Sequence, residues 1–305
     1  MNKNDMQQLV QSPELQLVNH SFVNALLEKI NYLFFLVNKE IDFINFEKMS
    51  LPYKQSVFKT ISSKTREVTA LAHMTQHHFD WQQGDTRSEW YDHFCDQHWQ
   101  FTHQDNCHWI ERAVFSNLAI ESGAEVLDLC SGDGYFAYHF YSSKAKNVTC
   151  IDIDESAIKH AKENFEDRKG INFVLGDIRK DIPNKKFDNI IWDAAIEHFS
   201  EQEIDSLLLK IKDTLNGDGI LSGQTIKEEE SEKFEYHEKE FTSKEELETF
   251  LKKYFKNVLV FETVYELLGR HADSKRHNFY YFASDGIIPF GKDWRHSLFS
   301  TTPTQ

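Results

Sequence analysis

The sequence contains few of the residue types that form long linkers or disulfide frameworks. Its 305 residues include only 5 Pro, 12 Gly and 4 Cys. So few Pro and Gly leave little room for extended flexible segments. The four cysteines are scattered and form no CxxC pair: Cys95, Cys107, Cys130 and Cys150. The sequence therefore predicts neither a disulfide framework nor a zinc finger.

Long apolar runs and a signal segment are also missing. Residues 1–10 are polar and lack the apolar core of a secretory signal. The run YLFFLV at residues 32–37 is far shorter than the roughly 20 residues that a membrane-spanning helix needs. We therefore expect a soluble cytoplasmic protein with no membrane partner.

The chain has fewer positively charged residues than negatively charged ones. The chain has 34 Lys and Arg against 49 Asp and Glu, a formal net charge of −15. Nucleic acids and anionic membranes favour the opposite balance, so no nucleic-acid partner is predicted. Hydrophobic residues make up 40% of the chain and charged residues 27%, which is typical of a folded globular protein.

The first third of the chain has helical periodicity. Apolar residues recur every three or four positions over residues 13–46. Further helices are expected from Pro52 to about Phe79, from Thr86 to Trp99, and from about Asn106. We predict an all-helical region over residues 1–105 that serves as a lid, as a homodimer interface, or as both.

From Gly123 onward the pattern alternates between strands and helices. Such alternation predicts a parallel sheet with helices on both faces. The acidic stretch 228–240 is expected to be a solvated loop, and Gly217 to Gly219 a turn. The predicted domain covers residues 106–290, with a tail over 291–305. Strands are expected at 125–129, 147–152, 171–175, 189–193, 220–225, 258–261 and 279–283.

The sharpest motif is VLDLCSGDG at residues 126–134. A strand delivers Asp128 to its carboxyl end, and Gly132 and Gly134 then let the backbone approach a ligand closely. Asp152 ends the next strand, where an acidic side chain can accept hydrogen bonds from both hydroxyls of a ribose. The pattern predicts a nucleoside-binding crevice at the strand ends.

These residues resemble the class I S-adenosylmethionine-dependent methyltransferases over about residues 110–285. The family's first motif reads hydrophobic-Leu-Asp-x-Gly-x-Gly-x-Gly, and this chain departs from it at Cys130. The segments Gly176-Asp177-Ile178 and FDNIIWD at 187–193 match the family's later motifs in order. The alternative is another Rossmann-type nucleotide binder, with Ala137 as the third small residue of an NAD motif.

The resemblance implies a Rossmann-like α/β fold with a seven-stranded, mostly parallel sheet, and S-adenosyl-L-methionine as the cofactor. The cofactor-binding residues that it implies are Asp128, Cys130, Gly132, Gly134, Asp152, Ile153, Asp177, Ile178, Trp192 and Asp193. The predicted activity is methylation of an oxygen on a small-molecule or sugar-like acceptor, in glycan or secondary-metabolite biosynthesis. N-methylation, or a cofactor-binding partner or regulatory protein without transferase activity, stays as an alternative.

His198 follows the fourth predicted strand at the mouth of the crevice. A hydroxyl acceptor must lose a proton, which suits a histidine. We hypothesise that His198 is the general base and that Glu197 or Asp193 orients it; the alternative is a polar loop residue without a catalytic role.

The pair Glu197-His198 matches the end of a Glu-x-x-Glu-His metal site found in some quinone-biosynthesis and small-RNA methyltransferases. Here the first glutamate is replaced by Ala194. Two ligands make a poor divalent site unless Asp193, His271 or His277 contributes, so no metal site is predicted.

Three residues are candidate acceptor contacts. Arg276 and His277 lie in the segment 269–278 before the last predicted strand, in a loop that can reach the acceptor pocket. Tyr91, with Trp99, could wall the site from the preceding helices. The alternatives are an exposed basic loop and ordinary core packing, respectively.

Overall fold

The computed structural model divides the chain into two compact units, Met1–Arg87 and Ser88–Gln305. The residues that it describes are 28–29, 31–32, 48–82, 93–94, 97, 108–165, 168–227, 237–266 and 275–288. The expected helices over 13–46 and 86–99 fall largely outside these ranges. The domain boundary at residue 105 stays a prediction.

Among the described residues of the first unit is the long helix α5 (Leu51–Gln82), which confirms the helix expected from Pro52. Three of its threonines, Thr60, Thr65 and Thr69, donate side-chain hydrogen bonds to the carbonyl four residues earlier. Glu67 pairs with Lys64 at 3.0 Å and with Lys29 at 3.3 Å. No helix among the described residues is long and apolar enough to cross a bilayer.

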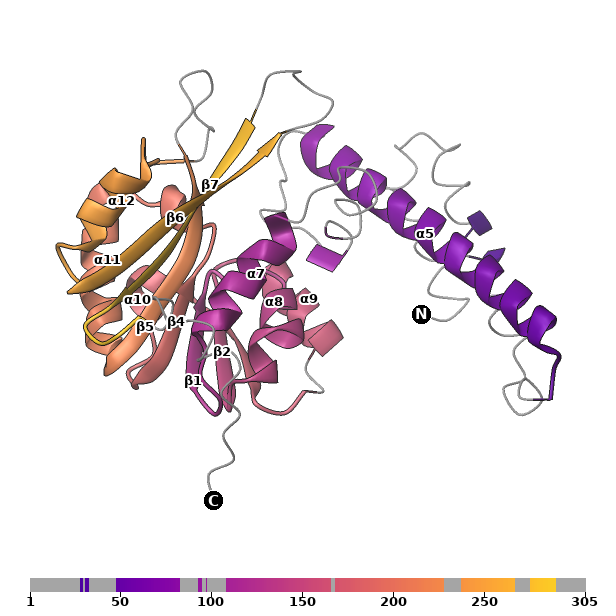
Figure 1. Ribbon diagram of the computed structural model, residues 1–305, viewed down its shortest axis with the longest axis horizontal. Helices are drawn as coiled ribbons and strands as arrows, with labels where there is room; N and C mark the ends of the chain where they lie inside the picture. Colours follow the sequence, from indigo (N-terminus) through magenta and orange to yellow (C-terminus); the bar gives the residue numbers. More distant parts are fainter. Residues whose placement is uncertain are drawn as a thin grey trace. The chain divides into compact units, whose positions relative to one another are not determined.

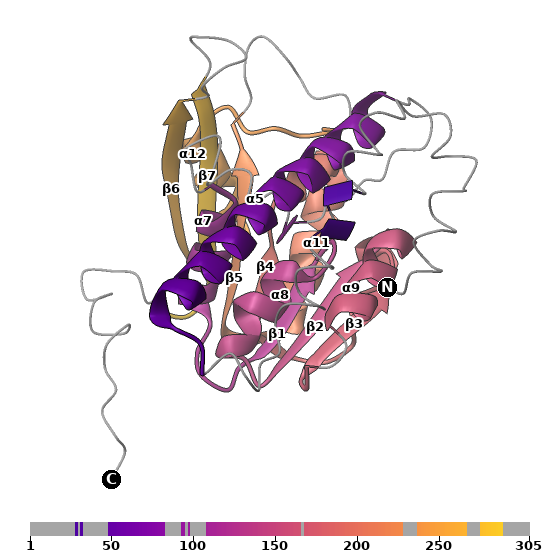
Figure 2. The same ribbon diagram turned by 90° about the vertical axis from the view of Figure 1, so that its right-hand side faces the viewer.

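The second unit is built on a seven-stranded sheet with the order β3-β2-β1-β4-β5-β7-β6 (Figure 2). Neighbours from β3 to β5 are parallel, and β7 is antiparallel to both β5 and β6. The strands are β1 (Glu125–Leu129), β2 (Asn147–Asp152), β3 (Ile171–Leu175), β4 (Phe187–Trp192), β5 (Leu215–Ile226), β6 (Asn257–Glu266) and β7 (Lys275–Ser284). The predicted Rossmann-like fold with a mostly parallel sheet is confirmed.

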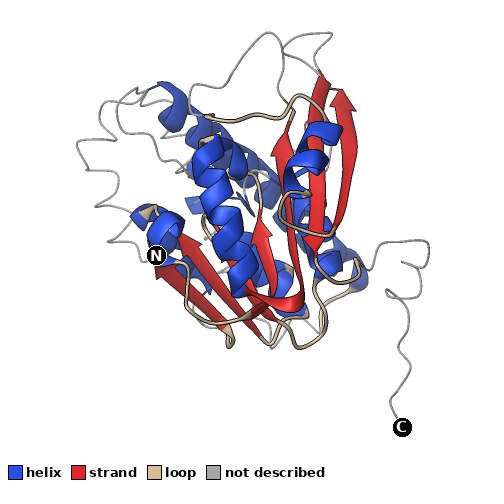
Figure 3. Ribbon diagram, turned by 90° about the vertical axis from the view of Figure 1, so that its left-hand side faces the viewer, coloured by secondary structure: helices blue, strands red, loops and turns tan. Residues whose placement is uncertain are grey.

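Helices cover both faces of the sheet (Figure 1). One face carries α7 (His108–Ala119), α8 (Tyr135–His139) and α9 (Glu155–Phe165). The other carries α10 (Ile178–Asp181), α11 (Glu201–Thr214) and α12 (Lys244–Leu251) (Figure 3).

Successive side chains of β1 point to opposite faces of the sheet, so this strand contributes to the core beneath both helical layers. Val126 packs with α7, α8 and α9, whereas Leu127 and Leu129 pack with α11 and α12. All three side chains are fully buried. Burying an apolar side chain of this size stabilises the fold by about 1.5–3 kcal/mol, so the strand holds the two layers together.

The start of β5 differs from the expectation. The segment Gly217 to Gly219, predicted as a turn, lies within the strand. The register of β4 against β5 shifts there, from Phe187 opposite Leu215 to Asn189 opposite Ile220. The register shift thus accommodates the glycine-rich residues within the strand, and pairing with β4 resumes at Ile220.

Candidate functional site

The loop after β1 is wound tightly by hydrogen bonds within its own backbone. Ser131 N donates to Ile151 O at 3.1 Å, and Gly134 N donates to Ser131 O at 3.1 Å. Gly134 has φ +71°, and a Cβ placed there would lie 2.4 Å from the Phe173 ring. Glycine is therefore required at this position both for conformation and for space.

Two non-glycine residues of the described chain have positive φ, and both follow neighbouring strands of the sheet. Cys130, after β1, has φ +55°, and Ala194, after β4, has φ +47°. This conformation costs about 1–2 kcal/mol for a residue with a Cβ. Such strained backbone gathers at functional sites, and here it marks the carboxyl ends of the two central strands.

Asp152 fastens the loop after β1 to the end of β2. Its Oδ2 accepts a hydrogen bond from Gly132 N at 2.8 Å, and its Oδ1 accepts one from Asp154 N at 2.9 Å. Burial raises the pKa of this carboxyl, although those backbone donors oppose the rise. The next residue, Ile153, is 57% exposed, so an apolar side chain faces solvent beside this acid.

Asp128 brings a second buried carboxyl to the same place. Burial raises its pKa well above the usual value, and the charges of Asp193 and Asp152 raise it further. The carboxyl ends of β1, β2 and β4 therefore bring three carboxyl groups together beside the glycine loop. A cationic ligand would be stabilised there.

Asp193, directly after β4, forms a buried ion pair that sequence reasoning missed. Arg112 of α7 donates from Nε and Nη2 to Asp193 Oδ2, each at 2.7 Å. Burial works to lower the pKa of the guanidinium, but Asp193 more than offsets this and the pKa is raised. Asp193 Oδ1 is buried and has no hydrogen-bond partner among the described residues. That oxygen is the kind of acceptor that a ligand can satisfy.

A second missed residue, His93, lies over the glycine loop. Its backbone N donates to Asp133 Oδ2 at 3.0 Å, and its Nδ1 lies 2.8 Å from Asp133 Oδ1. The imidazole packs edge-on to the Trp109 ring, with 5.0 Å between centroids, and against the Phe136 ring. No local pattern around residue 93 signals this contact.

The remaining predicted cofactor residues have structural partners. Asp177 caps α10 by accepting from Arg179 N at 3.0 Å, and its ion pair with Arg179 lowers its pKa. Ile178 and Trp192 are buried in the core on the α11 face. Tyr281 Oη donates to the Trp192 carbonyl.

The predicted catalytic pair lies in the 3-10 helix η3 (Ile196–His198), just beyond β4. Glu197 is 3% exposed, and its Oε2 accepts from Thr225 Oγ1 at 3.0 Å. His198 is exposed, with its ring centroid 4.9 Å from that of His237. The structure thus brings His237 beside the predicted pair. Asp193, the other residue expected to orient His198, instead binds Arg112.

The stretch 228–240 was predicted to be a solvated loop, but the part of it that the structure describes, residues 237–240, is partly buried. Glu240 is 5% exposed, and its Oε1 contacts His237 Nδ1. The backbone N atoms of Glu238 and Lys239 donate to the Glu197 carbonyl, at 2.8 and 3.2 Å. These bonds draw the end of the stretch onto η3, because buried polar groups need partners that solvent cannot supply.

Among the described residues, the predicted acceptor contacts are not brought together at one place. Arg276 and His277 belong to β7 and not to a loop before it, so that expectation was wrong; β7 begins earlier because it pairs with β6 along its whole length. His277 Nδ1 lies 2.5 Å from Glu262 Oε1 of β6. Tyr91 and the Arg276 side chain lie outside the described residues, as does Trp99.

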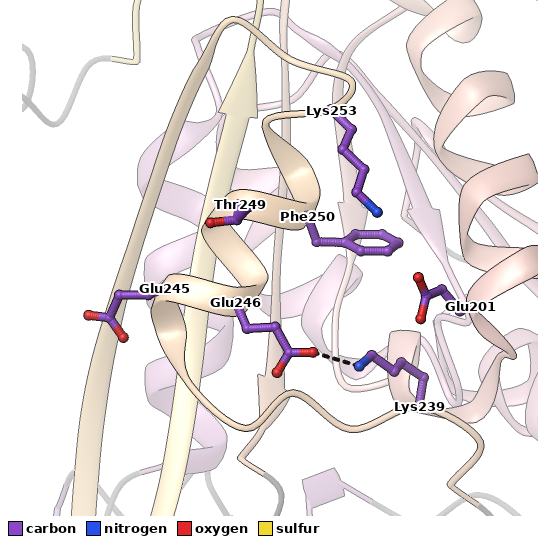
Figure 4. A pocket seen from close by; sticks show the side chains of 7 residues that line it. All are labelled: Glu201, Lys239, Glu245, Glu246, Thr249, Phe250 and Lys253. Atoms are coloured by element: carbon purple, nitrogen blue, oxygen red, sulfur yellow. Dashed lines mark hydrogen bonds and ion pairs between the residues drawn. The ribbon is translucent and has the colours of Figure 1, made fainter.

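A separate open pocket of about 420 Å³ lies beside α12 (Figure 4). Within it, Lys239 Nζ pairs with Glu246 Oε1 at 2.6 Å. None of the predicted site residues lines it; its lining residues are Glu201, Lys239, Glu245, Glu246, Thr249, Phe250 and Lys253. Its charged, open character differs from the apolar enclosure typical of small-molecule sites.

Comparison with known proteins places residues 126–219 in a family described as a methyltransferase domain. This match covers the glycine loop and the ends of β1, β2 and β4. Residues 126–219 of the chain match a methyltransferase domain.

Curated relatives of this methyltransferase domain act on different acceptors. It is similar to the ribosomal protein L11 methyltransferase of Staphylococcus saprophyticus, with 31% identity over 39% of this chain and 38% of the relative. The L11 methyltransferase of Aquifex aeolicus is 34% identical over 38% of this chain and 44% of the relative. The malonyl-[acyl-carrier protein] O-methyltransferase 2 of Ilyobacter polytropus is 28% identical over 29% and 36%. The chain thus spans less than half the length of these relatives.

Among solved structures, TehB from Haemophilus influenzae is similar, with a TM-score of 0.48 and 18% identity over 62% of this chain and 66% of that one. The N-methyltransferase NodS from Bradyrhizobium japonicum, in complex with S-adenosyl-L-homocysteine, has a TM-score of 0.45 and 17% identity over 62% and 92%.

Proposed function

We propose that the protein is an S-adenosyl-L-methionine-dependent methyltransferase that methylates a hydroxyl of a small-molecule or sugar-like acceptor. The observation that carries this proposal is the meeting of Asp128, Asp152 and Asp193 beside the glycine loop. Buried carboxyl groups that raise one another's pKa favour a nearby cation, and S-adenosyl-L-methionine carries a sulfonium. The methyltransferase-domain match over the same segment supports this choice.

The residues present fit that cofactor. Asp152 ends β2 and would receive the ribose hydroxyls, with Ile153 exposed beside it. The backbone of Cys130 to Gly134 would pass close to the methionine part, and the unpartnered Asp193 Oδ1 would accept from a donor there. When bound, the cofactor supplies a methyl group activated by the positive sulfur.

The protein's own groups would then bring the acceptor oxygen into line and remove its proton. Methyl transfer would form the C–O bond as the C–S bond breaks, and the hydroxyl proton would pass to the His198 imidazole. Glu197 lies next to His198 in η3 and would stabilise the imidazolium that forms.

A calorimetric comparison of two ligands tests the cofactor proposal. We expect wild type to bind both S-adenosyl-L-methionine and S-adenosyl-L-homocysteine, which lacks the sulfonium charge. The Asp128→Asn variant should lose affinity for the charged ligand by about tenfold, or roughly 1.4 kcal/mol, and for the neutral one by much less. Equal losses, or no binding by wild type, would contradict the proposal.

The acceptor is tested with radiolabelled methyl donor and panels of hydroxyl, amine and protein acceptors. Label transferred to hydroxyl compounds, reduced at least 100-fold in His198→Ala with cofactor binding intact, is the expected result. Label on amines alone would replace O-methylation by N-methylation. Cofactor binding without transfer to any panel would favour a partner or regulatory protein.

A second candidate acceptor is a protein. Two of the relatives named above are methyltransferases of ribosomal protein L11, and they match this chain at 31% and 34% identity. Label on purified L11 but on no small molecule in the panel would favour this candidate.

A further inference from the structure

We propose that Glu197, His198 and His237 form a binding site for one divalent transition-metal ion. The three side chains come from two segments: the first two from η3, and His237 from the segment that precedes α12. Their candidate ligand atoms all lie within 4.8 Å of one another. One carboxylate oxygen and two imidazole nitrogens are a ligand set suited to Zn²⁺, Co²⁺ or Fe²⁺.

The backbone holds the two segments together at this point. Glu238 N and Lys239 N, which directly follow His237, both donate to the Glu197 carbonyl. The His198 and His237 rings meet edge to face, at an interplanar angle of 82°. Bonds of about 2.1 Å to one ion require ligand atoms no more than about 4.2 Å apart, so small side-chain rotations complete the site.

The charge of the cluster calls for a cation. Two carboxylates, Glu197 and Glu240, are 3% and 5% exposed, and neither forms an ion pair with Lys or Arg within the described ranges. Glu240 Oε2 is buried and has no hydrogen-bond partner among those residues. Glu197 and Glu240 thus bring two buried carboxyl groups close to the two imidazoles, and buried carboxylates need a counter-charge, which a divalent ion would supply.

The neighbours of the proposed ligands are placed as metal sites require. Glu240 Oε1 contacts His237 Nδ1, which would leave Nε2 of that ring to bind the ion. Thr225 Oγ1 donates to Glu197 Oε2 at 3.0 Å and fixes that carboxylate. We assign Glu240 and Thr225 as positioning residues.

The site has a consequence for the acceptor that rests on the proposed function. It lies beyond β4 on the same segment as Asp193, and three protein ligands leave a coordination position open. An acceptor hydroxyl bound there would lose its proton to solvent water more readily. With the metal bound, His198 acts as a ligand and not as the general base, and the substrate class narrows to acceptors whose hydroxyl can coordinate a metal.

Metal binding is measured on the full-length chain after EDTA treatment and dialysis. Co²⁺ is titrated while its visible absorption is recorded, and Zn²⁺ is titrated by calorimetry. We expect one ion per chain. The His237→Gln and Glu197→Gln variants should bind at least 10-fold more weakly, and Glu240→Gln 10- to 100-fold more weakly.

His277→Gln is the matched control, because His277 also contacts a glutamate, Glu262, but lies outside the three-residue cluster. It should bind both metals as wild type does. Absence of a stoichiometric ion, or an equal loss in His277→Gln, would overturn the proposal. Glu197→Gln keeps an oxygen for Thr225, so it separates loss of a ligand from loss of fold.

Calorimetry with S-adenosyl-L-methionine on the same samples separates this proposal from the preceding one. Metal binding without cofactor binding would leave the metal site standing and refute the methyltransferase proposal. Cofactor binding without metal binding would refute the metal site and leave the methyltransferase proposal standing.

Discussion

Arg112 and Asp193 join α7 to the end of β4 across 81 positions of sequence. The sequence predicted Asp193 as a site residue because it ends the predicted strand 189–193 within a family motif. Its partner could not be predicted, because an arginine in an amphipathic helix gives no sign of which distant carboxylate it meets. Charge pairing inside a core depends on the packing of whole elements and not on local spacing.

We expect Arg112→Met to destabilise the protein by about 3–5 kcal/mol, because it leaves the Asp193 carboxylate buried without a counter-charge. Urea unfolding followed by circular dichroism measures this. The double variant Arg112→Met, Asp193→Leu should recover most of the loss. A double variant as unstable as the single one would show that packing, and not charge, dominates here.

Asp128 leads to a prediction about pH. Burial raises its folded-state pKa well above the unfolded value, so the folded chain binds this proton more tightly. Stability from this group is complete below the ordinary aspartate pKa of about 3.9 and is lost as pH rises toward the folded-state pKa. Asp128→Asn should therefore raise the free energy of unfolding at pH 7 but not at pH 3.5. A gain that is independent of pH would contradict this cause.

At the scale of elements, local signals predicted well. The Ser200–Glu203 capping box is present, with Ser200 N donating to Glu203 Oε2 at 3.0 Å, and α11 begins where it was expected. Both residues of such a box are close in sequence, so the pattern is readable without the fold. The strand β7 was predicted too short, because its first residues pair with β6, and pairing between distant segments leaves no local trace.

Alanine substitutions at three glycines can separate the cost of a positive φ from the cost of the Phe173 contact at Gly134. Gly217 has no close neighbour at its Cβ position and no positive φ, Gly123 has positive φ only, and Gly134 has both positive φ and the Phe173 contact. We expect alanine to be nearly neutral at residue 217, to cost about 1 kcal/mol at 123, and to cost at least 2–3 kcal/mol at 134. Thermal unfolding of the three variants checks the order. Equal losses at 123 and 134 would show that the Phe173 ring moves aside freely.

At the scale of the molecule, alternating strands and helices predicted the parallel sheet, and the motif order predicted which strand ends meet. The sequence did not predict that His237 joins Glu197 and His198, because the intervening stretch is acidic and is typical of a solvated loop. Only the buried backbone bonds onto η3 bring that histidine to the site.

The two units lead to a prediction about truncation. All predicted cofactor-binding residues lie within Ser88–Gln305, so a chain beginning at Ser88 should bind S-adenosyl-L-methionine within about threefold of the full chain, less than 1 kcal/mol apart. Calorimetry measures this, and light scattering on the same samples shows whether residues 1–87 mediate association. Loss of binding in a folded truncated chain would assign the first unit a part in the site.

Cys130 stands at the first turn of the crevice, where its thiol would be expected to meet oxidants and alkylating reagents. Burial raises its pKa well above the usual value, and the charges of Asp152 and Asp128 raise it further. The reactive thiolate is therefore scarce at neutral pH. The same carboxylates that would attract a cationic cofactor protect the thiol beside them, and a bound cation would weaken that protection by opposing their charge.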